Sequence, residues 1–465
     1  MARRRNGKNT ASASTRRTTI YRDELHKSIR RCLPNQGLAL QVENGKVSWT
    51  PRILVTCAIL WAWNAAATLK DRFAEARLST IDTYSSRRRP GQSYQGFISA
   101  LCRCSEHLLE VVCQTLRQLV REIAADYWTV DGWTAFGVDG TKVECSITEA
   151  NEKGFGRAGK EKCAPQQYLT MLLHLATGLP WAFERGPAKS SEREHLRQMI
   201  GLLPAESLVV ADAGFTGYDL LRELTRAGHS FVIRVGNNVR LLSKLGYYAR
   251  EFESLVYLWP QEKQGGRDSR GRRRKPAEEP LVLRLVTLHD GRQPVHLLTN
   301  VLDASRLSEK TMARAYELRW GLELYYRTLK QTMGKRKMLS DAPAQAGVEL
   351  DWSVIGLWML GVMMVEQSIA AGASPAQCSA ASALRVIRTA VARMRRRCRR
   401  GAIAREMRGA VKDGYTRRGS KTARNYPRKK KQRPPGGPII RTATETEVLL
   451  AQAFARRREE ESLAA

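Results

Sequence analysis

Two aspartates lie where apolar side chains would be expected. Asp139 interrupts the apolar stretch "FGVDGT", and Asp212 follows the apolar residues of "LVVADAGF". A carboxylate is costly to bury within a strand, although each aspartate taken singly could simply cap the helix after its strand. Two carboxylates about 4 Å apart repel by about 4 kcal/mol at an effective dielectric constant of 20, so a cluster needs protonation or a cation. Should the two meet, their oxygens suit Mg²⁺ or Mn²⁺.

A third acid, Glu323, lies on the segment "AYELRWGLELYYRTLKQTMG", whose apolar spacing predicts one amphipathic helix. With Tyr316 placed at zero, steps of about 100° put Arg319 at about 300°, Lys330 at about 320° and Glu323 at about 340°. These four side chains form a stripe along the border of the apolar face, whereas Glu317 projects to about 100°, away from it. The simpler alternative is a surface ion pair between Arg319 and Glu323, worth about 0.3–0.5 kcal/mol.

The net positive charge of the chain favours a polyanionic partner. Lys and Arg total 78 against 45 Asp and Glu in 465 residues, which gives a net charge of +33 and a pI of about 10.3. A hydrophobic content of 43% and 10 tryptophans indicate a folded body of enzyme size rather than a merely basic protein. Nucleic acid is therefore the favoured partner.

The elements that would position the acids follow from the periodicity of apolar residues. Residues from about 18 to 131 carry apolar side chains at spacings of three and four, which predicts helices. The pattern then changes to three strands, a helix, a strand ending near Asp212, a helix and a further strand. This succession predicts a mixed α/β sheet.

The acids also carry a family resemblance. Asp139 followed by Gly-Thr, Asp212 in D-A-G-F after a fourth strand, and Glu323 on a later helix resemble the acid triad of RNase H-like DDE transposases. The pattern Y-x2-R-x3-E-x6-K resembles the signature of the insertion-sequence-four type of bacterial transposase, and it is filled by Tyr316, Arg319, Glu323 and Lys330. The resemblance covers roughly residues 130–370.

This resemblance implies a DNA transposase that cleaves transposon ends and transfers strands into target DNA. Asp139, Asp212 and Glu323 would be its catalytic residues and would hold two Mg²⁺ (or Mn²⁺) ions, which can activate a water or a 3′-OH beside a phosphodiester. Tyr316, Arg319 and Lys330 would contact phosphates of the transposon end. The alternatives are a catalytically silent, transposase-derived DNA-binding protein and an RNase H-like nuclease without strand transfer.

One tryptophan is a further candidate for DNA contact. Family members that cut and paste often hold a flipped base on a tryptophan in an inserted β region, and Trp259 in "VYLWP" occupies the corresponding part of this chain. The alternative is that Trp259 packs on the face of a strand.

Composition and pattern together predict a multidomain α/β protein. Its parts are a basic disordered arm (1–17), a helical DNA-binding domain (18–130), an RNase H-like catalytic core of mixed sheet (131–235 and 301–371), a β-strand insertion (236–300), and a basic, partly disordered C-terminal region (372–465). We expect the basic side chains of Arg267–Lys275 in the insertion to be solvated or to lie along a DNA backbone.

The remaining expectations concern surroundings and partners. The 9 cysteines are scattered without the spacing of a zinc finger, which favours free thiols in a reducing cytosol. The longest apolar run, Ser353–Val365, is too short to span a bilayer and predicts a buried helix. We therefore expect a bacterial cytoplasmic protein, nucleoid-associated when bound to DNA. Its partners would be double-stranded DNA (terminal inverted repeats and target), with no membrane and a homodimer in the DNA complex.

Overall fold

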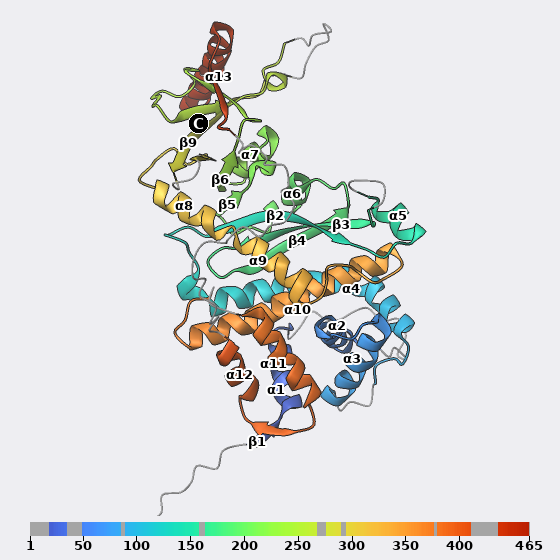
Figure 1. Ribbon diagram of the computed structural model, residues 1–465. Coiled ribbons are helices and arrows are strands. Elements are labelled where there is room, and N and C mark those ends of the chain that lie inside the picture. Colours follow the sequence, from blue (N-terminus) through green and yellow to red (C-terminus); the bar gives the residue numbers. More distant parts are fainter. Residues whose placement is uncertain are drawn as a thin grey trace, which may run out of the picture.

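The computed structural model describes residues 18–34, 49–84, 89–157, 163–266, 276–289, 294–375, 379–410 and 436–464. The predicted arm (1–17) and the basic loop Arg267–Lys275 lie outside these residues. In Figure 1, a twisted sheet occupies the upper half of the molecule and a layer of helices lies beneath it.

One half of the sheet is formed by five strands. They are β2 (Ala135–Glu144), β3 (Gln166–His174), β4 (Leu179–Pro187), β5 (Leu208–Ala211) and β6 (Ser230–Val235). β2 pairs antiparallel with β3 and parallel with β5, and β5 pairs parallel with β6. The predicted mixed sheet is thus confirmed. Two helices cover its upper face, α6 (Glu192–Ile200) and α7 (Tyr218–Arg226).

The strands of the predicted insertion do not make a sheet of their own. They extend the same sheet beyond β6, in the order β10 (Pro294–Thr299), β9 (Leu281–His289), β8 (Leu255–Leu258) and β7 (Arg240–Ser243). A last strand from the C-terminal region, β12 (Ile439–Thr442), pairs parallel with β7. Among the described residues, one sheet of 10 strands results.

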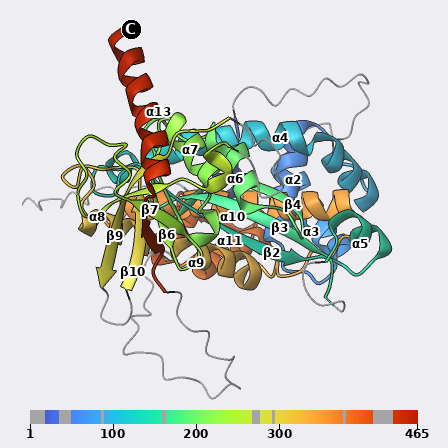
Figure 2. The ribbon, with the colours of Figure 1, turned by 90° about the horizontal axis from the view of Figure 1, so that it is seen from above.

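The C-terminal region is more ordered than the sequence predicted. After Gly372 the chain forms α11 (Ala380–Ala392), β11 (Arg397–Arg399), α12 (Ala402–Ala410), β12 and α13 (Glu445–Ala464). The apolar side chains of these elements join the cores of the helical layer and of the sheet, so the disorder predicted for part of 372–465 does not apply to them. Figure 2 shows α13 standing out from the end of the sheet.

The helical layer combines both ends of the chain. Its N-terminal helices are α1 (Tyr21–Arg31), α2 (Pro51–Trp63), α3 (Leu69–Thr83) and α4 (Tyr94–Ile123). They share one hydrophobic core with α10 (Pro343–Ala370), α11 and α12, and β1 (Thr18–Ile20) pairs with β11. The predicted helical domain of residues 18–130 therefore does not bury its apolar faces by itself.

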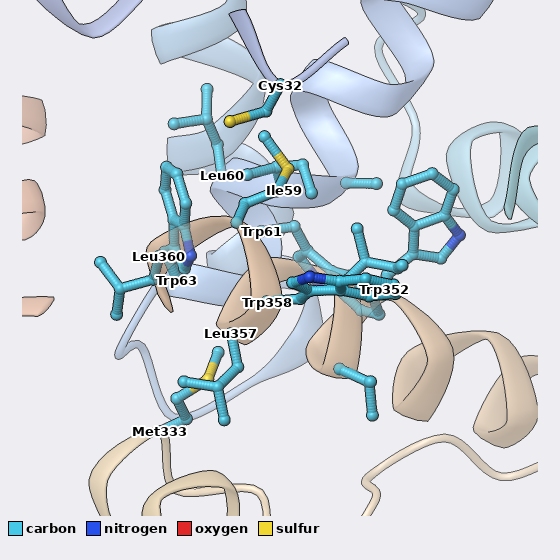
Figure 3. Close-up of a cluster of buried hydrophobic side chains, with 14 of the residues drawn as sticks. Cys32, Ile59, Leu60, Trp61, Trp63, Met333, Trp352, Leu357, Trp358 and Leu360 are labelled. Carbon is cyan, nitrogen blue, oxygen red and sulfur yellow. The ribbon is translucent and has the colours of Figure 1, made fainter. Parts of the chain in front are cut away.

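The contact between α2 and α10 is the centre of this core (Figure 3). Trp61 and Trp63 of α2 and Trp352 and Trp358 of α10 are fully or almost fully buried. Gly356 allows the two helices to approach closely, because a Cβ there would lie 3.1 Å from Ala62, and Trp63 Nε1 donates a hydrogen bond to the Gly356 carbonyl at 2.8 Å. The helix α10 is long and apolar enough to cross a membrane, but 94% of its most apolar window is buried inside the fold.

A buried cation lies beside this core. Lys335 is fully buried, its Nζ has no hydrogen-bond partner among the described residues, and the ammonium lies 5.7 Å from the centre of the Trp61 ring. Burial, together with Arg72 and Arg388 and against the opposing effect of Glu349, lowers the pKa of Lys335 from 10.5 to about 8. The fold thus disfavours the charged form of this amine relative to the unfolded chain.

We expect Lys335→Met to raise the free energy of unfolding at pH 7 by about 1–4 kcal/mol, as for other buried charges replaced by apolar groups. Below pH 8 the amine is protonated in both states and the wild type bears the full cost of burial. Between pH 8 and 10.5 unfolding takes up a proton, so wild-type stability rises with pH and the advantage of the variant shrinks. Urea titrations from pH 7 to 10 would measure this. The exposed Lys337→Met is the control, and a pH-independent difference between Lys335→Met and wild type would contradict the assignment.

Candidate active site

Asp139 and Asp212 lie next to each other on two neighbouring parallel strands. Val138 of β2 is paired with Ala211 of β5, so Asp139, in the middle of β2, lies beside Asp212, the first residue after β5. The apolar residues that precede each aspartate are buried, and a glycine follows each aspartate within two residues, Gly140 after Asp139 and Gly214 after Asp212. The sheet therefore brings together two carboxylates that are 73 residues apart in the sequence (212 − 139 = 73).

The guanidinium of Arg319 lies between these two carboxylates. Its Nη1 is 3.7 Å from Asp139 Oδ2, and its Nη2 is 3.4 Å from Asp212 Oδ2. Arg319 is only 6% exposed and lies over the ring of Tyr316, whose hydroxyl donates to Asp212 Oδ1 at 3.0 Å. One buried positive charge thus offsets the repulsion between the aspartates.

The backbone around Asp139 is also held in place. Its Oδ1 accepts a hydrogen bond from the Gly140 amide at 2.9 Å, and its carbonyl accepts one from the Tyr326 hydroxyl at 2.7 Å. Burial raises the pKa of Asp139 and the charge of Asp212 adds to this effect, while the Gly140 amide and Arg319 lower it.

The helix that carries the third acid is interrupted, contrary to the prediction of one continuous helix. It consists of α8 (Glu309–Leu318), α9 (Gly321–Arg327) and a π-helical turn (Thr328–Thr332). At the break the amide of Trp320 bonds back to Glu317 and that of Leu322 to Arg319, three residues back in each case. Arg319, at this tighter turn, reaches both Asp139 and Asp212.

The two glutamates of this segment differ as the helical projection predicted. Glu317 is exposed, whereas Glu323 is partly buried. Burial raises the pKa of Glu323; Arg319 lowers it, and Asp139 and Asp212 raise it. Glu323 is therefore within electrostatic range of both aspartates.

Lys330 contacts the same strand from the other end of the segment. Its Nζ donates to Thr141 Oγ1 at 2.7 Å, two residues after Asp139. Tyr316, Arg319 and Lys330 thus bind protein groups around the two aspartates in this structure. Their predicted contacts to DNA phosphates stay predictions.

Trp259, the candidate for base stacking, is a packing residue in this structure. It is 3% exposed, its Nε1 donates to the Glu278 carbonyl at 2.7 Å, and its ring meets Phe454 of α13 edge-on at 6.4 Å. At this exposure the ring has no open face for a base, so the structure favours the alternative that the sequence left open. The missing information was the position of α13, which comes from the far end of the chain.

A cationic cavity of about 900 Å³ opens beside Trp259, between the first turns of α6 and α7 and the strands β7 and β8. Its lining includes five cations, Arg193, Arg197, Arg240, Lys263 and Arg441, and three acids, Glu194, Asp219 and Glu262. Of the cations, Arg197, Lys263 and Arg441 form ion pairs. The Nε of Arg193 donates to the carbonyl of Gly214, two residues after Asp212, so Arg193 connects the wall of the cavity to the segment that follows this aspartate.

The sequence interpretation did not consider Glu192, a carboxylate near enough to Asp139 and Asp212 for their charges to act on it. It is the first residue of α6, and its side chain accepts a hydrogen bond from Tyr168 of β3. Burial raises the pKa of Glu192, and the charges of Asp139 and Asp212 add to this. In the sequence "SSEREHL" it looks like any acid in the first turn of a helix, so only its position in the fold reveals it.

These residues only partly fit a metal centre as they stand. Carboxylate oxygens are the donors that Mg²⁺ and Mn²⁺ take, and Asp139 and Asp212 are close enough to share one guanidinium. Within the described ranges, however, no three Asp, Glu, His or Cys side chains lie together as a metal site. Arg319 takes the place between the aspartates that a cation would otherwise fill.

Comparison with known proteins agrees with this geometry. The family model described as "Transposase DDE domain" matches residues 134–358, which include Asp139, Asp212 and Glu323. Over these residues the chain matches the DDE transposases. The chain is also 27% identical over 338 residues to the transposase InsG for insertion sequence element IS4 of Escherichia coli (strain K12), with 70% of this chain and 72% of InsG covered. The resemblance to the insertion-sequence-four type is thus confirmed.

Among solved structures, the transposase is similar to the piggyBac transposase synaptic complex with hairpin DNA. The TM-score is 0.41 at 11% identity, over 88% of this chain and 87% of the piggyBac chain. A score of this size does not establish a shared fold.

Proposed function

We propose that this transposase cleaves DNA at the ends of an insertion-sequence element and joins those ends to target DNA. The observation that carries the proposal is that Asp139 and Asp212 lie side by side on adjacent parallel strands, with Glu323 within electrostatic range and Arg319 between them. The strand order β4-β3-β2-β5-β6, in which β2 is flanked by β3 and β5, supports an RNase H-like core. InsG, the relative named for an insertion-sequence element, supports the substrate.

The three acids would hold the divalent ions in this proposal. Two bound Mg²⁺ or Mn²⁺ ions would polarise the scissile phosphate and activate a water or a 3′-OH. For Asp139 and Asp212 to bind an ion together, the guanidinium of Arg319 must leave its position between them.

The cationic side chains would then bind and orient DNA. Arg319 carries a planar fork of donors that can pair with two phosphate oxygens, and Lys330 supplies a point charge. Tyr316 would keep its ring against Arg319 and so fix the direction of the guanidinium. The five cations of the cavity beside α6 would guide a DNA backbone toward the aspartates, in keeping with a net charge of +33.

The proposal includes a homodimer that holds two ends of the element, in a bacterial cytoplasm. The competing function is that of a catalytically silent DNA-binding protein derived from a transposase. The presence of all three acids and of the Tyr-Arg-Glu-Lys signature favours the catalytic function.

An assay on a plasmid tests the proposal. The purified protein is incubated in Mg²⁺ with a plasmid that carries the flanking ends of its own gene, and with the same plasmid lacking them. We expect cleavage at the ends and joined products from the first plasmid only, and none in EDTA. Binding to the ends without any cleavage in Mg²⁺ or Mn²⁺ would establish the silent protein instead.

A further inference from the structure

Two strands that are far apart in the sequence form a ribbon at one end of the helical layer. β1 and β11 pair antiparallel, with Thr18 opposite Arg399 and Ile20 opposite Arg397. The ribbon lies at the end of the helical layer that is farthest from the sheet (Figure 1). Asp139 belongs to β2 and Asp212 follows β5, so the helical layer separates the ribbon from both aspartates.

The ribbon carries four arginines on its outer surface. Arg396, Arg397, Arg399 and Arg400, called the arginine row below, are all exposed. Arg397 and Arg399 are two residues apart on β11, so their side chains leave the same face of the strand about 7 Å from each other. Cys398, between them, packs against the hydrophobic core of the helical layer. The strand thus has an apolar inner face and a cationic outer face.

The backbone beneath the arginine row is fixed by the N-terminal part of the chain. The amide of Tyr21 donates to the carbonyl of Arg396 at 3.2 Å, and the amide of Arg22 donates to the carbonyl of Met394 at 3.0 Å. Met394 is 4% exposed and belongs to the core of the helical layer. Because the backbone is already ordered, little of its freedom would be lost when the arginines bind a partner.

The arginine row has no counter-ion within the chain. Among the described residues no acid forms an ion pair with any of its four members, whereas the neighbouring Arg395 binds both carboxylate oxygens of Asp82, at 3.0 and 2.9 Å. Four like charges within five residues repel one another. A partner with closely spaced negative charges would remove this repulsion.

We propose that the arginine row binds the phosphate backbone of duplex DNA, without regard to base sequence, at a site separate from Asp139 and Asp212. Guanidinium groups pair well with phosphate oxygens, and contacts of this kind carry no sequence information. A duplex presents one negative charge per about 1.7 Å of its axis, so several phosphates can face the row. Since the helical layer lies between, the bound stretch would be one other than the stretch being cut. The inference rests on the DNA binding of the proposed function, but not on cleavage.

The test measures how salt weakens DNA binding. The full chain is compared with a variant that carries Arg396→Gln, Arg397→Gln, Arg399→Gln and Arg400→Gln, by fluorescence anisotropy with a labelled duplex of random sequence. Each lost phosphate contact should make the fall of log K with log salt concentration shallower by about 0.9, so the fourfold variant should lose up to about 3.6 of the slope. We expect the same loss with a duplex of the element end.

A charge-matched control separates a site from an effect of net charge. The control replaces four exposed cations that form no ion pair among the described residues and lie on α3, α4, α7 and the segment after β7, by Lys70→Gln, Arg103→Gln, Arg226→Gln and Arg250→Gln. We expect its slope to stay close to that of the wild type. Equal losses in the two variants, or an unchanged slope in the arginine-row variant, would overturn the inference and leave the proposed function standing.

Two other outcomes would also count against the inference. A loss confined to the element-end duplex would mean that the row contacts the ends specifically, which contradicts binding without regard to sequence. A wild-type chain that binds neither duplex would remove the DNA binding of the proposed function and this site with it. Melting temperatures accompany the titrations, and removal of neighbouring like charges should leave the fourfold variant at least as stable as the wild type. If that variant fails to fold, Arg397→Gln and Arg399→Gln tested singly should each lower the slope by about 0.9, and no change in either would overturn the inference.

Discussion

Glu323→Gln is expected to lower the rate of Mn²⁺-dependent nicking of a terminal-repeat duplex by at least about two orders of magnitude, which corresponds to about 2.7 kcal/mol of lost transition-state stabilisation. The amide keeps the size of the side chain but removes the negative charge that we assign to the third metal ligand. Folding should change little, since Glu323 is only partly buried. Nicking rates under single-turnover conditions, with melting temperatures measured alongside, would show this.

Glu317→Gln is the matched control for this experiment. Glu317 lies six residues earlier in the same segment (323 − 317 = 6), on the exposed side of α8. We expect it to nick at close to the wild-type rate. Equal losses in the two variants, or a larger one in Glu317→Gln, would mean that the Tyr-Arg-Glu-Lys stripe is a surface of ion pairs and that the metal ligands lie elsewhere.

The second large effect is expected for the strand aspartates. Asp139→Asn and Asp212→Asn should each abolish cleavage in Mg²⁺ to the limit of detection, because each removes a ligand oxygen charge from the centre. DNA binding should persist, and it should even tighten slightly, because a negative charge facing the phosphates is lost. Gel-shift titrations and cleavage assays on the same duplex separate the two properties.

The contacts of Arg319 supply a check on these variants. Each substitution leaves the buried guanidinium with only one carboxylate partner, at 3.4 Å in Asp139→Asn or 3.7 Å in Asp212→Asn if nothing moves. A modest fall in melting temperature is therefore expected in both. Cleavage at the wild-type rate by either variant would remove that aspartate from the proposed centre.

Some features of the site were predictable because they depend on short stretches of sequence. The apolar runs before Asp139 and Asp212 are long enough to specify buried strands, and a parallel pairing of β2 and β5 then places the two aspartates side by side. The projection of Arg319, Glu323 and Lys330 onto one side of a helix survived the break at Trp320, because the apolar residues around them still pack against β2 and β3. The roles of these residues in catalysis and in DNA binding stay predictions.

Other features depend on contacts between parts of the chain that are far apart. Trp259 packs against Phe454 of α13, which is about 195 residues further on (454 − 259 = 195). The insertion strands join the sheet through the pairing of β10 with β6, and β12 forms one edge of the sheet. The N-terminal helices need α10 to α12 to bury their apolar faces. None of these pairings has a local signature, since an apolar face indicates that it will be covered but not by what.

The sequence by itself determined the family, the mixed sheet and the three acids of the signature, because motif spacing and apolar periodicity are properties of neighbouring residues. Tertiary structure alone decided that Arg319 lies between Asp139 and Asp212 and that α13 packs against Trp259. The physical reason is that electrostatic and packing energies depend on distances in space. A charged side chain on a helix looks the same in the sequence whether it faces water or two carboxylates.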